Sequence, residues 1–288
     1  MVYLSHKKYT QEKNIFLYPN NNEANRNAAI NNDTIQLNAD AKRFVPEGMF
    51  VCLAGGEARY LPRATVSTAT ATNAATVVCT PSQIFKTSDV LYVVEPYATV
   101  TLGGTVAVND IVTITVDGYA LAVTATTTVL ADLVTLVKNS INADNVLNQK
   151  VFALTAGSDV YIFAKDGVST YSIAVAETSA AVTIAIGGSA TALGFGAALG
   201  TVASVNVTTN TVTLSGNAAA VVPVGTHIGV RTISEVLGVD AHQRDYTDAE
   251  TQTIGVYDIS SGVRENFLPY IDGDIKRRLP RITFITKA

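Results

Sequence analysis

Two segments of this chain resemble each other, and neither is expected to fold alone. Residues 63–96 and 200–233 each read as strand, Asn-containing turn, strand, loop and strand, with alternating apolar and polar residues. Corresponding residues are Thr65 and Thr201, Asn73 and Asn210, Val77 and Val212, and Leu91 and Ile228. A three-stranded half leaves an apolar face exposed, so the halves are expected to pack as a small barrel or sandwich. Repeated Thr-Val pairs also match through composition alone, so the duplication is a hypothesis.

The residues between these segments, 98–198, predict a module of a different class. Asp117 and Gly118 form a two-residue hairpin signal between Ile111–Val116 and Tyr119–Thr124. Apolar residues then recur at three- and four-residue steps, which predicts a helix from about 128 to 142 with one apolar face. Further strands are expected at 151–155, 160–164, 171–176 and 181–186. A helix covering one face of an antiparallel sheet makes a self-contained ββαβββ module.

Charge is concentrated at the two ends of the chain. Residues 1–63 and 240–288 together hold 15 of the 20 Lys and Arg residues and 14 of the 24 Asp and Glu residues. We therefore predict a mainly β fold, in which a small β-barrel or sandwich body carries an inserted module and extended N- and C-terminal arms. The expected divisions are an arm at 1–45, a body at 46–97 with 199–240, the insert at 98–198 and an arm at 241–288.

Composition also bears on compartment and partners. A net charge of −4 argues against nucleic-acid binding, which normally needs a basic surface. The stretch 180–199 is uncharged and long enough to span a bilayer, but its glycines and strand-like alternation favour a strand and a loop, so no membrane role is expected. The start of the chain has no apolar signal-peptide region. Cys52 and Cys79 lie in apolar runs and are expected to be buried free thiols.

Residues with catalytic or metal-binding chemistry are few and scattered. His6, His227 and His242 lie far apart and lack companions at metal-ligand spacing. Acidic residues around His242, from Asp240 to Asp248, suggest a cation site or an oriented base, although a polar linker has the same composition. The glycines of 194–200 precede a strand instead of the helix that a dinucleotide loop requires. We expect no cofactor, no metal and no enzymatic activity.

The ends are the expected attachment sites. Near the C-terminus, aromatic and aliphatic residues are interleaved with arginines, and both are common interface anchors. The candidate interface residues are Ile15, Phe16, Leu17, Phe267, Tyr270, Arg277, Arg278 and Arg281. The alternative is a last strand of the body with a solvated basic turn. If the ends are arms, deleting 1–40 or 264–288 leaves the body folded and removes partner binding.

The chain resembles one group of structural proteins in its general plan. The segment "IVTITVDGYALAV…LADLVTLVKNSINA" is similar to small modules of tailed-bacteriophage structural proteins, and the Thr/Val/Asn-rich body with charged ends resembles capsid decoration (cement) proteins. No residue-specific motif supports the resemblance, so no functional residue is carried over.

The resemblance implies a non-enzymatic virion protein, made in the host cytoplasm, that binds the outside of the capsid shell. It would stabilise the shell by bridging major capsid protein subunits, as a homo-oligomeric dimer or trimer at local symmetry axes. The alternatives are a phage tail or fibre protein, and a surface adhesin or carbohydrate-binding module. An adhesin or carbohydrate-binding module normally needs an export signal and an aromatic platform, and the chain contains no Trp.

Overall fold

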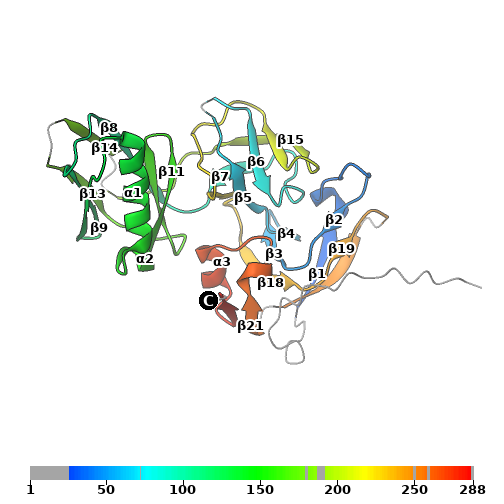
Figure 1. The fold of residues 1–288 in the computed structure, drawn as a ribbon. Coiled ribbons are helices and arrows are strands. Elements are labelled where there is room, and N and C mark those ends of the chain that lie inside the picture. The colour runs from blue at the N-terminus through cyan, green and yellow to red at the C-terminus, as the bar shows by residue number, and fades with distance from the viewer. Residues whose placement is uncertain are drawn as a thin grey trace, which may run out of the picture.

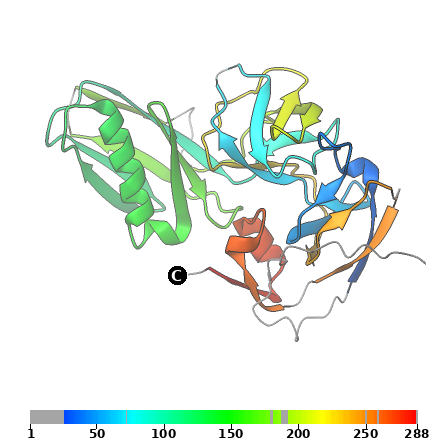
Figure 2. The same ribbon diagram turned by 45° about the vertical axis from the view of Figure 1, so that its right-hand side comes forward.

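The computed structural model describes residues 26–71, 73–178, 181–186, 192–248, 251–257 and 260–286. The fold is mainly β, as predicted, and has three parts (Figures 1 and 2). We call them the barrel (63–96 with 199–230), the insert (97–198) and the terminal lobe (26–62 with 231–286). No helix within the described ranges has the length and apolar character needed to cross a bilayer.

The barrel is closed by six antiparallel strands, three from each of the two similar segments. In order around the barrel the strands are β15 (Gly200–Asn206), β16 (Thr211–Leu214), β6 (Thr76–Thr80), β5 (Arg63–Thr68), β17 (His227–Gly229) and β7 (Val90–Val93). Alternate side chains of these strands, led by β-branched and aliphatic residues, fill its interior. The expectation of a barrel or sandwich is thus resolved in favour of a barrel.

The strand pairing supports the internal duplication. The third strand of each half pairs with the first strand of the other half, so neither half is complete without its partner. The registers also match: Ala64 pairs with Ile228, and the corresponding residue Gly200 pairs with Leu91. Composition alone does not produce equal registers, so the structure confirms the predicted correspondence between the halves.

An approximate two-fold axis relates the two halves. Val77 pairs with its own counterpart Val212, which places such an axis between them. Both first hairpins also break register at the same place. The breaks lie between Val66 and Thr68 and between Val202 and Ser204.

The insert connects the two halves and contains two sheets and a helix around one core. One sheet has the order β11 (Val151–Ala156), β12 (Asp159–Ala164), β8 (Tyr97–Gly104) and β14 (Val182–Ile186). The other has the order β10 (Tyr119–Thr124), β9 (Ile111–Val116) and β13 (Ile173–Glu177). The helix α1 (Leu130–Ala143) packs mainly on β11, and the short α2 (Leu147–Lys150) follows it. The expected helix and hairpin are confirmed, whereas the central strand β8 was not predicted.

The four-stranded sheet of the insert is apolar on both faces. On β12, Val160 and Ile162 belong to the insert core, while Tyr161 and Phe163 between them pack against the barrel core. The ring of Phe163 stacks on Phe152 at 5.0 Å between centroids and lies 5.5 Å from Tyr97. The insert is therefore not the self-contained module that the sequence suggested, because one of its sheets forms a wall shared with the barrel.

The terminal lobe is built from both ends of the chain. Its three-stranded sheet has the order β18 (Glu235–Asp240), β3 (Met49–Ala54) and β4 (Glu57–Tyr60). Three further strand pairs are β1 (Arg26–Asn31) with β20 (Thr251–Val256), β2 (Phe44–Val45) with β19 (Arg244–Asp245), and β21 (Ser260–Arg264) with β22 (Ile282–Ile285). Its helical segments are α3 (Gly273–Arg278), η2 (Asn32–Thr34) and η3 (Glu265–Phe267).

The arm assignment is wrong for the described residues of 26–45 and 241–286. Ile30 and Ile35 are fully buried in one core of the terminal lobe, and Ile275 is fully buried in the other. The strands β3, β4 and β18, which we had placed in the barrel body, pack with these ends instead. Charged residues at the ends were a poor guide because they alternate with apolar ones that meet only in the folded chain.

A shared wall predicts that the barrel and the insert unfold together. Phe163→Ala removes a ring that contacts both, and we expect a loss of about 3–5 kcal/mol in the free energy of unfolding. Val108→Ala, at an exposed position, should change it by less than about 0.5 kcal/mol. Urea unfolding followed by far-ultraviolet circular dichroism measures both. Two separate transitions, with only one shifted by Phe163→Ala, would show that the wall does not couple the two parts.

Both thiols are expected to be unreactive in the folded protein. Cys52 and Cys79 are free and fully buried, and burial raises the pKa of each to about 12. Because the thiolate is the nucleophile, a disulfide reagent should label them only as fast as the chain opens. Two thiols should react at once in guanidinium chloride. Immediate labelling of the native protein would contradict this expectation.

Candidate functional site

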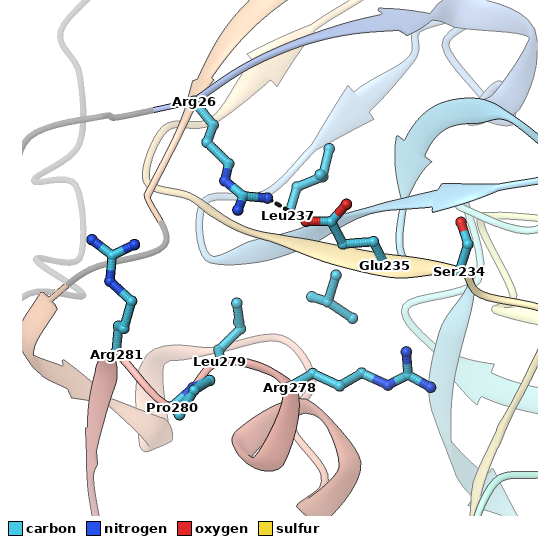
Figure 3. Close-up of a pocket in the computed structure, with 9 residues that line it drawn as sticks. Arg26, Ser234, Glu235, Leu237, Arg278, Leu279, Pro280 and Arg281 are labelled. Carbon is cyan, nitrogen blue, oxygen red and sulfur yellow. Dashed lines mark hydrogen bonds and ion pairs between the residues drawn. The ribbon is translucent and has the colours of Figure 1, made fainter.

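A groove on the terminal lobe is the most developed candidate for a binding site. It has a volume of about 290 Å³ and lies between β18 and the segment that follows α3 (Figure 3). Its lining residues are Arg26, Ser234, Glu235, Val236, Leu237, Arg278, Leu279, Pro280 and Arg281. Val236, Leu237 and Leu279 are buried and form the floor, while Pro280 and most of the polar residues are exposed at the rim. We call this site the β18 groove.

The β18 groove runs beside an outer strand of a sheet. β18 is an outer strand of its sheet, with β3 on one side. On the other side the described residues provide one isolated bridge, between Val239 and Tyr257. Val236 packs in one core of the terminal lobe and Leu237 in the other, so their side chains point to opposite faces of the sheet. A groove lined by both residues must follow the strand edge.

Arginines surround this edge. Arg26 at the start of β1 pairs with Glu235 at 2.5 Å, and both side chains are almost half exposed. Arg278 and Arg281 approach from the opposite side of the groove (Figure 3). The lining thus contains three guanidinium groups and one carboxylate.

The short helix α3 positions the second wall. Asp272 caps its first turn, accepting from the backbone N–H of Ile275 at 2.7 Å. The sequence "DGDIKRR" then places acidic residues at the start and basic ones at the end, as the helix dipole favours. Arg278 donates to Asp274 one turn earlier, at 2.9 Å. At Gly273 a Cβ would lie 2.0 Å from the backbone oxygen of Lys165, so only glycine allows the helix to approach the insert this closely.

A buried arginine fixes α3 to the barrel. Arg63 on β5 donates to Asp272 and to Asp274, each at 2.7 Å. Burial alone would lower the pKa of Arg63, but these carboxylates raise it above its ordinary value. Burial would raise the pKa of Asp274, but Arg63 and Arg278 hold it below its ordinary range. The groove wall therefore depends on ion pairs that join two parts of the molecule.

A second polar cluster lies beside Arg63 and Asp272, where the barrel meets the terminal lobe. His227 on β17 contacts Glu95 through Nδ1, and its ring meets that of Tyr270 edge to face at 5.2 Å. The hydroxyl of Tyr270 donates to Asp272 at 2.5 Å. Glu95 is almost completely buried, and its Oε2 atom has no hydrogen-bond partner. Burial opposes protonation of the imidazole, but the nearby Glu95 carboxylate outweighs it and raises the pKa of His227.

The structure separates the predicted interface residues into different environments. Tyr270 is buried in the core, so its interpretation as a surface anchor is wrong. Phe267 packs at the margin of the same core. Arg278 and Arg281 line the β18 groove, while Arg277 is half exposed and pairs with Asp274. Ile15, Phe16 and Leu17 lie outside the described residues.

The acidic stretch near His242 has a structural role around Asp240. The buried Asp240 carboxylate accepts from Tyr60 at 2.8 Å and from Arg244 at 3.0 Å. Across the described ranges, no group of three or more His, Cys, Asp and Glu side chains is arranged to hold a metal ion.

Sequence reasoning missed the other side of the groove. Arg26 and Glu235 are separated by 209 positions, and no local pattern connects them. The only available signal was the basic run after Asp274, which marks one wall.

No protein-family model matches this chain, and no curated protein sequence matches it significantly.

The His227 cluster predicts a pH-dependent stability. Because the folded-state pKa of His227 is raised, the stabilisation is complete below the unfolded value of about 6.5 and is lost as the pH rises through the folded value. The charged groups facing the ring are Glu95, Asp272 and Arg63. His227→Gln keeps a hydrogen-bond donor but removes the charge.

The measurement is the difference in unfolding free energy between the unchanged protein and His227→Gln, taken from urea titrations at several pH values. We expect that difference to be larger at pH 6 than at pH 9. A difference that is constant with pH would show that the imidazole does not carry a charge in the folded state.

Proposed function

We propose that this chain is a non-enzymatic structural protein of a bacteriophage virion. It binds the outside of the capsid shell and stabilises the shell by bridging major capsid protein subunits. The observation that carries the proposal is the β18 groove, which lies beside an outer strand, is lined by three arginines and is braced from behind by buried ion pairs. Such a site suits attachment to another protein, because a strand edge offers backbone groups and arginines offer charge.

The arrangement of the three parts supports a load-bearing role. Arg63 connects the barrel to α3, and Arg59 on β4 donates two hydrogen bonds to Asp89 before β7, both at 2.8 Å. The wall shared by barrel and insert adds an apolar connection. Attachment through the terminal lobe would therefore act on a body whose parts are firmly joined.

Bridging also sets a condition on oligomeric state. Each chain carries one copy of the β18 groove, so a molecule that joins two shell subunits through it must be at least a dimer. A dimer or trimer on a local symmetry axis meets this condition, and repeated weak contacts then combine into tight binding.

In this proposal the ends of the chain contribute to attachment as parts of the folded terminal lobe and not as separate arms. Deleting 264–288 would remove α3 and the buried Ile275 and Leu279, so the terminal lobe would not fold. Attachment must be tested with single substitutions on the folded surface instead.

The test is co-sedimentation of the purified protein with expanded capsids and, separately, with purified tails of the source phage. We expect saturable binding to capsids, and capsids that resist heating better when decorated. Arg281→Glu should weaken binding roughly two- to fivefold per contact, the size of an exposed ion pair, and more in an oligomer. Lys138→Glu, on α1 of the insert, is the matched charge reversal and should have no effect.

Binding to tails alone would favour the tail or fibre alternative. Binding to neither would remove the proposal, provided that circular dichroism shows the protein to be folded.

A further inference from the structure

We infer that the contact between His227 and the segment 265–279 is a pH-dependent switch. The charged imidazole holds this segment against the barrel, and the neutral imidazole lets it open more often while the barrel stays closed. Segment 265–279 contains η3 and α3 and belongs to the terminal lobe. The switch acts within one chain, so it goes beyond the proposed function and does not depend on it.

His227 lies where the three parts of the molecule meet. It belongs to β17 of the barrel, and its ring meets the ring of Tyr270 in the terminal lobe edge to face at 5.2 Å. The ring of Phe152, on β11 of the insert, lies 6.2 Å from it. The His227 side chain is 20% exposed, so water reaches it without unfolding of the chain. A proton can therefore bind or leave at a contact between parts of the folded molecule.

The charged groups that face His227 come from separate elements. Glu95, which follows β7, contacts Nδ1 of the ring, and its buried carboxylate has one oxygen, Oε2, without a hydrogen-bond partner. Asp272, just before α3, adds a second negative charge and accepts from the hydroxyl of Tyr270, while Arg63 on β5 opposes the imidazolium. A buried carboxylate is costly without a cation beside it, so loss of the His227 charge destabilises the closed contact.

The direction of the pH effect follows from these charges. Burial alone would lower the pKa of His227, but Glu95 and Asp272 outweigh burial and raise it in the closed state. When 265–279 opens, Asp272 leaves and water reaches the ring, so the pKa returns toward its ordinary value of about 6.5. The stabilisation is thus complete below about pH 6.5 and is lost as the pH rises through the raised value. The ion pairs of Arg63 with α3 remain, so the change is one of population.

The two native thiols report separately on the terminal lobe and on the barrel. Cys52 is fully buried in the core that also contains Tyr270 and Ile275 of the opening segment. Cys79 is fully buried in the core of the barrel. Opening of 265–279 alone should therefore expose Cys52 and leave Cys79 protected, whereas global unfolding exposes both.

The test measures the labelling rate of each cysteine in the folded, full-length chain between pH 6 and pH 9. The reagent is methyl methanethiosulfonate at low concentration, and digestion with pepsin in acid followed by mass spectrometry assigns the label to one cysteine or the other. The rate for the same cysteine in the urea-unfolded chain at each pH corrects for the reactivity of the thiol. The corrected rate then reports how often that site opens.

We expect the corrected rate of Cys52 to rise at least about threefold from pH 6 to pH 9, since each pKa unit between the closed and open states changes the equilibrium about tenfold. At pH 9, Cys52 should label at least about tenfold faster than Cys79. Its labelling should also accelerate less with added urea, because partial opening exposes less surface than unfolding does.

Three variants assign the effect to the imidazole. His227→Gln cannot be protonated and should remove the rise at Cys52. Glu95→Gln removes a charge that favours the imidazolium and should reduce the rise. The matched control is His242→Gln, the same change at an exposed histidine of the terminal lobe, and it should keep the full rise.

Three results would overturn the inference. Equal corrected rates at both cysteines, with the same dependence on urea, would show that only global unfolding exposes Cys52. A Cys52 rate that does not rise with pH, or a rise that persists in His227→Gln, would show that the imidazole does not control the segment. These outcomes leave the proposed function untouched, because co-sedimentation with capsids tests it separately.

Discussion

The position of Arg63 between Asp272 and Asp274 is the interaction on which the arrangement of this molecule depends. All three side chains are buried, so replacing Arg63 would leave the Asp272 carboxylate without a cationic partner in the interior, at a cost of about 3–5 kcal/mol. The arginine comes from the first strand of the barrel, and the two carboxylates come from α3, more than two hundred positions later. These two ion pairs hold α3 against β5, and they thereby also hold the wall of the β18 groove that carries Arg278.

The barrel explains how such a large insert is tolerated. The insert leaves after β7 and returns at β15, and these two strands are neighbours in the closed barrel, with Gly200 opposite Leu91. Its two ends are therefore held side by side by strand pairing, which is where a fold accepts an added module most easily. The sheet that contains β8, β11 and β12 covers one side of the barrel with aromatic side chains. The insert and the barrel are therefore joined by packing as well as by the covalent chain.

The ends of the chain have a role different from that of arms. Their strands pair with each other and pack with β3 and β18, and the lobe brings Arg26, Glu235 and Arg281 to one groove. A binding surface assembled from three distant parts of the chain exists only when the terminal lobe is folded. If the protein attaches to a partner as we propose, its attachment depends on the stability of this lobe, and the groove is the surface in which to make substitutions.

The sequence by itself determined most local elements of the insert and indicated the correspondence between the barrel halves. Strand alternation, the Asp117–Gly118 turn and the apolar periodicity of α1 are short-range signals, and the two halves share enough of them to be aligned. Only the tertiary structure decided which faces are buried. Tyr161 and Phe163 look like the outer face of a strand until the barrel covers them, and Ile30 looks like part of a polar arm until β20 pairs with its strand. The β18 groove also depends on the tertiary structure. Its ion pair joins residues about two hundred positions apart, and only folding brings them together, whereas a sequence pattern indicates contacts between near neighbours only.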